Sequence, residues 1–284
     1  MAVADTRFKL NTGAEIPALG LGIHIDGAFC YQNEEEVGKG IRDALASGKV
    51  KREDLFVTTK LWCTYHSRVE EALEKSLKNL GLDYIDLSNN LLGNHPLFPK
   101  HEDGSRDIDH SHSHVQTWKN MEKLLATGKV KAIGVSNYSV RYLEQLLPEA
   151  TVVPAVNQIE NHPSLPQQEI VDFCKKKGIH ITAYSPLGST GSPLFTAEPI
   201  VEVAKKKGVT PATVLLSWHI ARGSSVLAKS VTPSRIEDNR KLVQLDESDM
   251  ATIAKYTDDL AARKAFQRFV YPPFGVDFGF PDKS

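Results

Sequence analysis

The sequence predicts an α/β protein whose parallel strands close into a (β/α)8 (TIM) barrel. Three observations lead to this fold class: continuous apolar runs, helical patterns between them, and eight strand candidates. The runs do not alternate in polarity, which is typical of strands buried on both faces. Strands that alternate with helices to the carboxyl terminus indicate a parallel sheet, and a barrel of this kind needs eight of them. The candidates are residues 18–22, 23–26, 55–60, 84–88, 132–136, 155–160, 179–185 and 225–230.

Helices are predicted between the strands from a period of 3.6 residues. Residues 34–47 and 68–80 each place their apolar side chains on one stripe. Glycines behind basic residues, such as Gly81 and Gly208, mark expected helix ends. No Gly-x-Gly-x-x-Gly leads from a strand into a helix, so a Rossmann fold is not favoured. No linker rich in Gly, Ser or Pro divides the chain, and residues 1–284 are expected to form one domain.

Composition excludes several classes of partner. The formal charge is -1, from 34 basic and 35 acidic residues, so no overall field favours nucleic acid or an acidic membrane surface. Three isolated cysteines without a CxxC pair fit a reducing compartment. The amino terminus lacks an apolar signal core, and no run approaches the ~18 apolar residues of a membrane span. We expect a cytoplasmic, monomeric enzyme that acts on a small molecule.

Polar residues at the predicted strand ends point to proton transfer. Lys60 closes an apolar strand, where its ammonium needs a partner or a depressed pKa. A buried lysine beside a tyrosine stabilises the phenolate, and a nearby aspartate holds the lysine in position. Asp26, Tyr31 and Lys60 therefore predict a proton-donating unit. Each residue alone is equally compatible with a structural polar group at a strand end, and the order of the three favours the functional interpretation.

Six segments resemble the aldo-keto reductase family, in the family's order and over nearly the whole chain. They are "DGAFCYQNEEEVG", "VTTKLW", "GKVKAIGVSNYS", "VNQIENHP", "AYSPLGS" and "LAKSVTPSRIEDN". The resemblance implies a (β/α)8 barrel that binds NADPH (or NADP+) extended across the strand ends. It also implies reduction of aldehydes or ketones to alcohols, or the reverse oxidation.

The resemblance assigns a role to each matching residue. Tyr31 would donate the proton, Lys60 would lower its pKa, and Asp26 would pair with Lys60. The nicotinamide would be held by Ser136, Asn137, Gln158 and Tyr184, and the pyrophosphate by the turn Ser185, Leu187, Gly188 and Ser189. The 2′-phosphate would contact Lys229, Ser230, Val231, Thr232 and Arg235, and the adenine would contact Asp238 and Asn239. Trp62 and Cys30 would line the substrate cavity, although Trp62 equally fits the core. The tail, residues 269–280, would cover the pocket mouth.

The chemistry of one segment supports the choice of cofactor independently. "KSVTPSR" offers two cations and several hydroxyls at a strand end and a helix start, which suits a phosphate dianion. It favours NADPH over NADH, because NADH carries a 2′-hydroxyl there. The alternative is an ordinary capped helix with a solvated basic face.

Two segments depart from the family. In "GLGIHID", Gly22 runs directly into the second strand, whereas parallel neighbours need a crossover of roughly a dozen residues. The first helix is missing, so the first strand is displaced or the barrel closes poorly. After "LDYIDL" the family's active-site histidine is absent, and His95 is expected to be a loop residue without a catalytic part. Both gaps resemble clean excisions, and we expect marginal stability with weak or undetectable activity.

Two other functions remain open. The loop "HEDGSRDIDHSHSH" carries imidazoles and carboxylates that could bind zinc or manganese in a metal-dependent barrel hydrolase. Such ligands normally lie on strand ends and these lie in a loop, so no metal is expected. Its candidates are His101, Glu102, Asp103, Asp107, Asp109, His110, His112 and His114. The other alternative is a cofactor-binding protein whose catalytic side is impaired.

Overall fold

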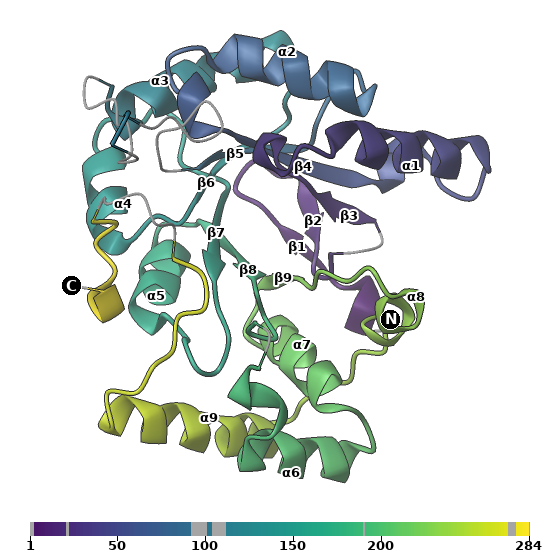
Figure 1. Cartoon of the computed structure of the whole chain (residues 1–284), viewed down its shortest axis with the longest axis vertical. Coiled ribbons are helices and arrows are strands. Elements are labelled where there is room, and N and C mark those ends of the chain that lie inside the picture. Colours follow the sequence, from purple (N-terminus) through teal and green to yellow (C-terminus); the bar gives the residue numbers. More distant parts are fainter. Residues whose placement is uncertain are drawn as a thin grey trace.

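The computed structural model describes residues 3–20, 23–91, 101–103, 112–189, 191–271 and 277–283. A parallel sheet lies at its centre with helices around it, which confirms the predicted fold class (Figure 1). Seven strands follow one another in chain order around the sheet. They are β3 (His24–Asp26), β4 (Phe56–Leu61), β5 (Leu87–Leu91), β6 (Ile133–Ser136), β7 (Val156–Glu160), β8 (His180–Tyr184) and β9 (Ser225–Leu227).

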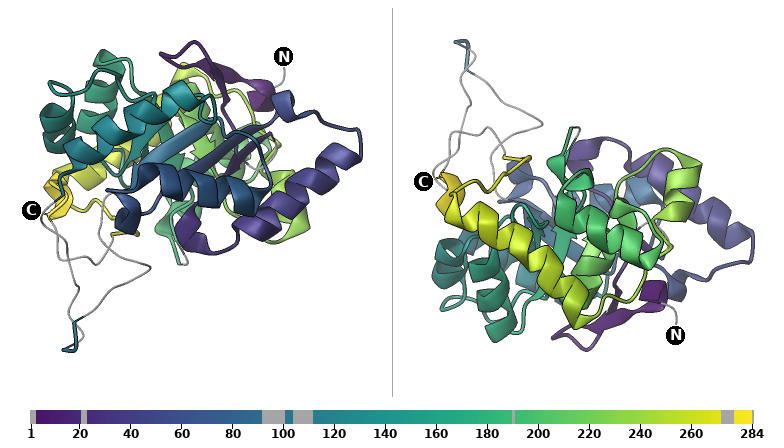
Figure 2. Two further views of the ribbon diagram at one scale, coloured as in Figure 1. Left: turned by 90° about the horizontal axis from the view of Figure 1, so that it is seen from above. Right: turned by 90° about the horizontal axis from the view of Figure 1, so that it is seen from below.

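The helices cover the outside of this sheet, as two further views show (Figure 2). Both helices predicted in detail are confirmed, as α1 and α2, and α2 and α6 end at glycines with φ of 65° (Gly81) and 66° (Gly208). The helices are α1 (Glu34–Ala46), α2 (Val69–Leu80), α3 (His114–Leu124), α4 (Val140–Leu146), α5 (Gln168–Lys176), α6 (Glu198–Lys207), α7 (Pro211–Ala221), α8 (Pro233–Asp238) and α9 (Glu247–Ala262).

Residues 18–20 stand between β9 and β3, where the eighth strand of the barrel belongs. Leu19 forms a parallel bridge with Val226, and Gly20 forms one with His24. The Gly20 amide donates to the Val226 carbonyl at 2.8 Å. Residues 18–20 therefore keep their place between β9 and β3 although the crossover is missing. We call this segment, held by one isolated bridge on each side, the seam. The junction itself, Leu21 and Gly22, lies outside the described residues.

A hairpin that the sequence did not predict closes the amino-terminal end of the barrel. Its strands β1 (Arg7–Lys9) and β2 (Glu15–Pro17) pair antiparallel. Ile16 is fully buried in a cluster with Phe56, Leu87 and Val156, which are the first residues of β4, β5 and β7. The opposite end of the barrel, where the strands finish, remains available for a functional site.

The predicted strand 84–88 is wrong in position. The strand is β5, and it begins at Leu87 and continues to Leu91. Asp86 therefore precedes the strand, where it pairs with Arg52 at 2.9 Å, and it does not belong to the carboxyl-terminal edge. Ladders with β4 and β6 on both sides hold this segment extended despite the low strand propensity of Ser and Asn. In the described part of the chain, no helix is long and apolar enough to span a bilayer.

Candidate active site

Asp26 and Lys60 form a buried ion pair at the carboxyl-terminal end of β3 and β4. Their side chains are 13% and 3% exposed, and Lys60 Nζ lies 2.5 Å from Asp26 Oδ2. Lys60 Nζ also donates to the Gly27 carbonyl at 3.0 Å. The other carboxylate oxygen of Asp26 accepts a hydrogen bond from Gln158 Nε2 at 2.8 Å. Asp26 thus connects the lysine to β7 across the barrel.

The surroundings of Lys60 favour its charged form. Burial alone lowers its pKa, but the Asp26 carboxylate and Tyr31 outweigh this effect, and the net pKa is raised. The site therefore contains a permanent positive charge inside the barrel, with one carboxylate to balance it.

Tyr31 ends a short 3-10 helix, η2 (Phe29–Tyr31), next to this pair. Lys60 Nζ lies 5.5 Å from the centre of the tyrosine ring. The Lys60 charge lowers the pKa of Tyr31 as expected, but burial, Asp26 and Cys30 together raise it by more. The net pKa of Tyr31 is raised, which is opposite to the direction implied by the resemblance. The side chain of Tyr31 is nevertheless 57% exposed, so the predicted proton donor lies at an open surface.

The ends of β6, β7 and β8 bring the predicted nicotinamide-binding residues together. The Ser136 hydroxyl and the backbone amide of Asn137 both donate to the backbone carbonyl of Gln158, at 3.0 and 2.9 Å. The Tyr184 hydroxyl donates to Asn137 Oδ1 at 2.8 Å. Asn137 has a φ of 61°, which turns its side chain back over the strand ends. Burial, followed by the Glu160 charge, raises the pKa of Tyr184 well above its usual value.

The predicted pyrophosphate turn follows β8 directly. The Gly188 amide donates to the Ser185 carbonyl at 2.8 Å, and Gly188 has a φ of 74°. A Cβ at Gly188 would lie 2.4 Å from the Ser192 hydroxyl and 2.9 Å from the Phe269 ring. Only glycine fits this turn, because both its backbone angle and its contacts exclude a side chain.

The predicted phosphate-binding residues lie after β9 and on α8. The exposed side chains of Lys229 and Arg235 make no ion pair within the described residues. Thr232 donates its amide to the Ser230 hydroxyl at 3.1 Å, and Val231 is 89% exposed. The adenine candidates differ, because Asp238 is exposed and paired with Lys241, whereas Asn239 is 8% exposed. This segment is open and carries two cations available to an anion.

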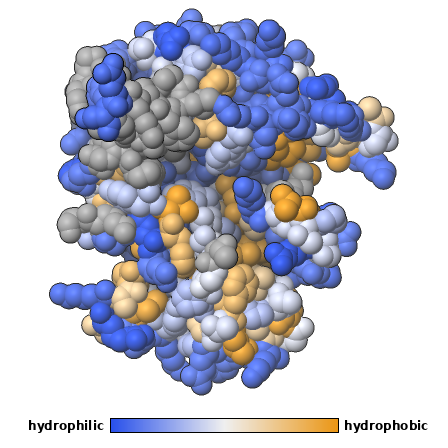
Figure 3. Space-filling model, viewed as in Figure 1, coloured by the Kyte–Doolittle hydropathy of each residue, from blue (hydrophilic) through white to orange (hydrophobic). Residues whose placement is uncertain are grey.

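The substrate-side candidates are less exposed than expected. Trp62 is 4% exposed and belongs to the main hydrophobic core. Cys30 is half-buried, and burial raises the pKa of its thiol to about 11, so the thiol is protonated. Viewed as in Figure 1, apolar residues gather toward the middle of the molecule's face (Figure 3).

Comparison with known proteins identifies the family. The Aldo/keto reductase family matches residues 17–258. The chain belongs to this family. D-galacturonate reductase of Hypocrea jecorina is 60% identical over 307 residues, which cover 98% of this chain and 99% of that protein. Glycerol 2-dehydrogenase (NADP(+)) of Saccharomyces cerevisiae is 44% identical over 306 residues, covering 94% and 96%. The solved aldose reductase of Schistosoma japonicum has a TM-score of 0.84 and 34% identity, covering 93% of each chain.

The comparison with the Hypocrea enzyme also bears on the two departures from the family pattern. The aligned stretch of 307 residues is longer than this chain of 284, so that relative contains residues without a counterpart here. This agrees with segments having been lost from an otherwise ordinary aldo/keto reductase.

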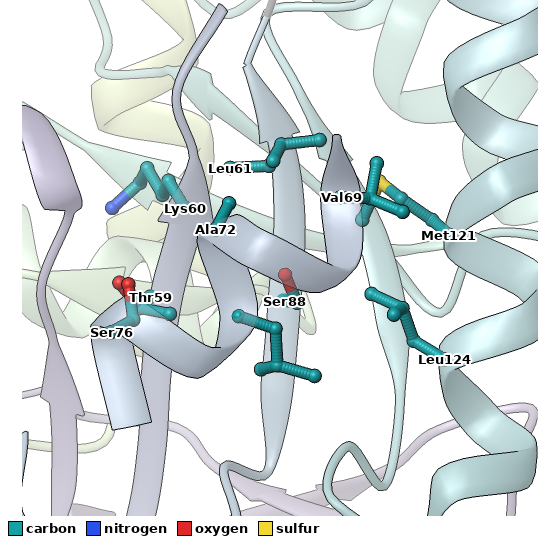
Figure 4. A pocket seen from close by; sticks show the side chains of 10 residues that line it. Thr59, Lys60, Leu61, Val69, Ala72, Ser76, Ser88, Met121 and Leu124 are labelled. Carbon is teal, nitrogen blue, oxygen red and sulfur yellow. The ribbon is translucent and has the colours of Figure 1, made fainter. Parts of the chain in front are cut away.

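Two features of β5 accompany the second departure from the family pattern, the absence of the histidine segment. Asn89 is in register with Lys60 and fully buried, and among the described residues neither its side-chain nitrogen nor its side-chain oxygen has a hydrogen-bond partner. On the other face, Ser88 borders a hollow of about 10 Å³ against α2 and α3, with Ser76 and Met121 on its far side (Figure 4). Two consecutive residues of β5 therefore fit their surroundings poorly. Asn89 does so in the barrel interior, and Ser88 does so against the helices outside. His95 lies outside the described residues.

The candidate metal loop is described in part. Among its described residues, His114 begins α3 and its Nε2 lies 3.1 Å from Gln145 Oε1. Its ring packs against Tyr138 and Tyr142. Asp107, Asp109 and His110 lie outside the described residues, and those that are described contain no cluster suited to a metal ion.

Sequence reasoning missed one polar residue of this region, Glu160. It ends β7, its side chain is fully buried, and it binds two backbone amides of the carboxyl-terminal tail. A glutamate at the end of an apolar strand, in "NQIENHP", was the available signal.

Proposed function

We propose that the chain is an NADPH-dependent reductase of aldehydes or ketones, or catalyses the reverse oxidation, with Tyr31 as the proton donor. The observation that carries the proposal is the link Lys60–Asp26–Gln158. It joins the proton-donating unit to the residues expected to hold the nicotinamide. Residues 1–284 would act as one domain.

The residues present fit NADPH. Lys229 and Arg235 supply two exposed cations for the 2′-phosphate. The turn from Ser185 to Ser189, which follows β8 directly, would hold the pyrophosphate. Ser136, Asn137 and Gln158 would bind the nicotinamide amide, and Tyr184 would stack on the ring. When bound, the cofactor supplies the hydride.

The chain's own residues would manage the proton. The Tyr31 hydroxyl would donate it to the substrate oxygen as negative charge develops there. Lys60, held in its charged form by Asp26, would stabilise the phenolate that remains. Lys60 and Asp26 therefore act through Tyr31.

The names of the relatives suggest the substrate class. One relative is a D-galacturonate reductase and another a glycerol 2-dehydrogenase, so we propose polyhydroxylated carbonyl compounds derived from sugars. D-galacturonate and dihydroxyacetone, the ketone formed when glycerol is oxidised at C2, are suitable first substrates.

Cofactor preference provides the first test. In a fluorescence titration, we expect NADPH to bind much more tightly than NADH. Arg235→Ala and Lys229→Ala should each weaken NADPH binding about 10- to 100-fold, because a charge-assisted phosphate contact contributes roughly 1.5–3 kcal/mol. Lys255→Ala, an exposed lysine of α9, controls for net charge. Equal affinities for the two cofactors would contradict the proposal.

A second candidate function is cofactor binding with impaired catalysis. It is favoured by the 57% exposure of Tyr31, whose hydroxyl has no hydrogen-bond partner among the described residues. Without a group that fixes the carbonyl, a misplacement of ~1 Å costs about 100-fold in rate. Aldehyde-dependent NADPH oxidation by the unmodified chain separates the two functions. Turnover on the ordinary scale of roughly 1–1000 per second would exclude the impaired variant.

A further inference from the structure

We propose that Glu160 is a positioning residue that fastens the carboxyl-terminal segment 267–271, here called the strap, over the pyrophosphate turn and so slows release of the cofactor. The inference rests on the proposed function and adds a device that controls the lifetime of the bound cofactor.

The carboxylate of Glu160 is occupied by the strap. Its Oε1 accepts the Phe269 amide at 2.7 Å and its Oε2 accepts the Val270 amide at 2.9 Å. His162 Nε2 lies 3.1 Å from Oε1, and both side chains are fully buried. Two backbone amides on one buried carboxylate are charge-assisted hydrogen bonds, roughly twice as strong as neutral ones. This is the strongest attachment of the strap to the barrel.

Further contacts fix the strap on both sides of these bonds. The Gln267 amide donates to the Ser164 carbonyl at 2.9 Å. Arg268, with its side chain 1% exposed, donates to Gln167 at 2.9 Å and pairs with Asp282. Figure 1 shows the chain after α9 running back beside α5 toward the end of β7. The strap therefore crosses this edge of the barrel in a defined register.

The strap reaches the cofactor site through Phe269. The ring of Phe269 lies 5.2 Å from that of His162, and its edge lies 2.9 Å from where a Cβ on Gly188 would be. Glu160 is also in register with Tyr184, the residue before the turn. The Glu160 carboxylate thus connects β7, which carries Gln158 of the proposed nicotinamide site, to Phe269, whose ring lies beside the Gly188 turn.

This geometry predicts an effect on dissociation in particular. A ring seated against Gly188 must move before a pyrophosphate held by the turn can leave, whereas the chemistry at Tyr31 does not involve the strap. The strap opens more often when its amides lose the carboxylate, because local opening is governed by the few bonds that hold a segment. The cofactor's dissociation rate should therefore change more than its association rate or the hydride-transfer rate.

The experiment is stopped-flow NADPH fluorescence with Glu160→Gln. We expect the dissociation rate to rise about 10- to 100-fold, the equivalent of one charge-assisted bond, with the association rate and single-turnover reduction changed far less. Phe269→Ala, which retains both backbone bonds to Glu160, should raise dissociation similarly. Asp277→Ala is the matched control, because Asp277 fastens a more distal part of the tail to Arg141 at an exposed position away from Gly188.

Each outcome has a defined meaning. Unchanged dissociation in both variants of a chain that binds NADPH would overturn this inference and leave the proposed function intact. A rise in Glu160→Gln without one in Phe269→Ala would also overturn it, since the ring would not be the connection. Failure of the unmodified chain to bind NADPH would contradict the proposed function itself. Hydrogen exchange tests the attachment without cofactor: the Phe269 and Val270 amides should lose protection in Glu160→Gln and keep it in Asp277→Ala.

Discussion

The strand β7, on the proposed cofactor side of the barrel, and the strand β5, on the proposed substrate side, differ in how well their buried side-chain amides are hydrogen-bonded. In β7, the buried amides of Asn157 and Gln158 both have partners, Tyr138 and Asp26. In β5, Asn89 is equally buried, and its side-chain amide has no partner in the described part of the chain. The seam beside β3 rests on isolated bridges, whereas β7 and β8 pair along five residues. At these positions, the proposed cofactor side is the better paired of the two.

The difference shows that the two sides of this site are built independently. Each strand is held by ladders to its neighbours and by the helix that follows it, so loss of a loop changes its own surroundings first. The ion pair of Asp26 and Lys60 persists beside the shortened seam, because it depends on strand register and not on the missing helix.

The largest expected effect tests whether the two sides are also independent in function. Tyr31→Phe removes the proposed proton donor and should lower the rate of reduction by about 100- to 10,000-fold. NADPH affinity should be unchanged, because no proposed cofactor contact is lost. Tyr65→Phe is the control, since among the described residues the Tyr65 hydroxyl is bonded to Lys75 alone, at an exposed position. An unchanged rate in Tyr31→Phe would show that another group supplies the proton.

The pH dependence of folding stability tests both sides of the barrel together, because each side carries a buried histidine. Burial lowers the pKa of His24, on β3, and of His180, on β8, each to about 4. The unfolded chain binds these protons below pH ~6.5, so folding stability is present above that pH and is lost as pH falls toward 4. The loss should be roughly 1 kcal/mol per pH unit for each histidine. Urea unfolding at several pH values measures the slope.

The two histidines can be compared directly. His24→Gln and His180→Gln should each flatten the dependence on pH by a similar amount, since burial is the leading cause for both. A slope that changes in only one variant would mean that the barrel interior near the other histidine is already open to water.

How much of the structure can be predicted from the sequence depends on the kind of interaction that holds each element. Local patterns predicted α1 and α2, and the residue types and matched motifs predicted that Asp26 would pair with Lys60. The hydrogen bond from Gln158 to Asp26 was not predicted. Position in β5 could not be predicted, because "LSNNL" has low strand propensity and is extended only through pairing with β4 and β6. The same holds for residues 18–20, whose place is set by Val226, more than 200 positions away.

The active-site electrostatics were predictable in part. The pairing of Lys60 with Asp26 followed from residue types and order. The net rise in the pKa of Tyr31 did not, because it depends on how burial, Asp26 and Cys30 balance Lys60. The binding of the tail by Glu160 also escaped, since it joins residues about 110 positions apart through backbone amides, which carry no sequence signal.

A smaller effect is expected from a pair of matched asparagine substitutions. Asn89→Leu replaces an amide without partners by an apolar side chain of the same branching, and should raise stability by about 1–3 kcal/mol. Asn157→Leu removes bonds to Tyr138 and should lower stability by a similar amount. Thermal or urea unfolding measures both. If Asn89→Leu is destabilising, the Asn89 amide binds a water or a substrate atom, and reductase activity in that variant would then fall.

The smallest effect concerns the outer face of the same strand. Ser88 lies between Thr59 and Ile133 in the sheet, and beneath α2 and α3 it leaves a hollow of about 10 Å³ (Figure 4). Ser88→Val adds a branched apolar side chain suited to a strand and should raise stability by up to about 1 kcal/mol. Ser88→Ala is the control, because it removes the hydroxyl without filling the space. Since overpacking is also destabilising, a Val variant less stable than the Ala variant would show that the helices already fit Ser88 closely. In that case the weakness of β5 lies in its interior, at Asn89, and not against its helices.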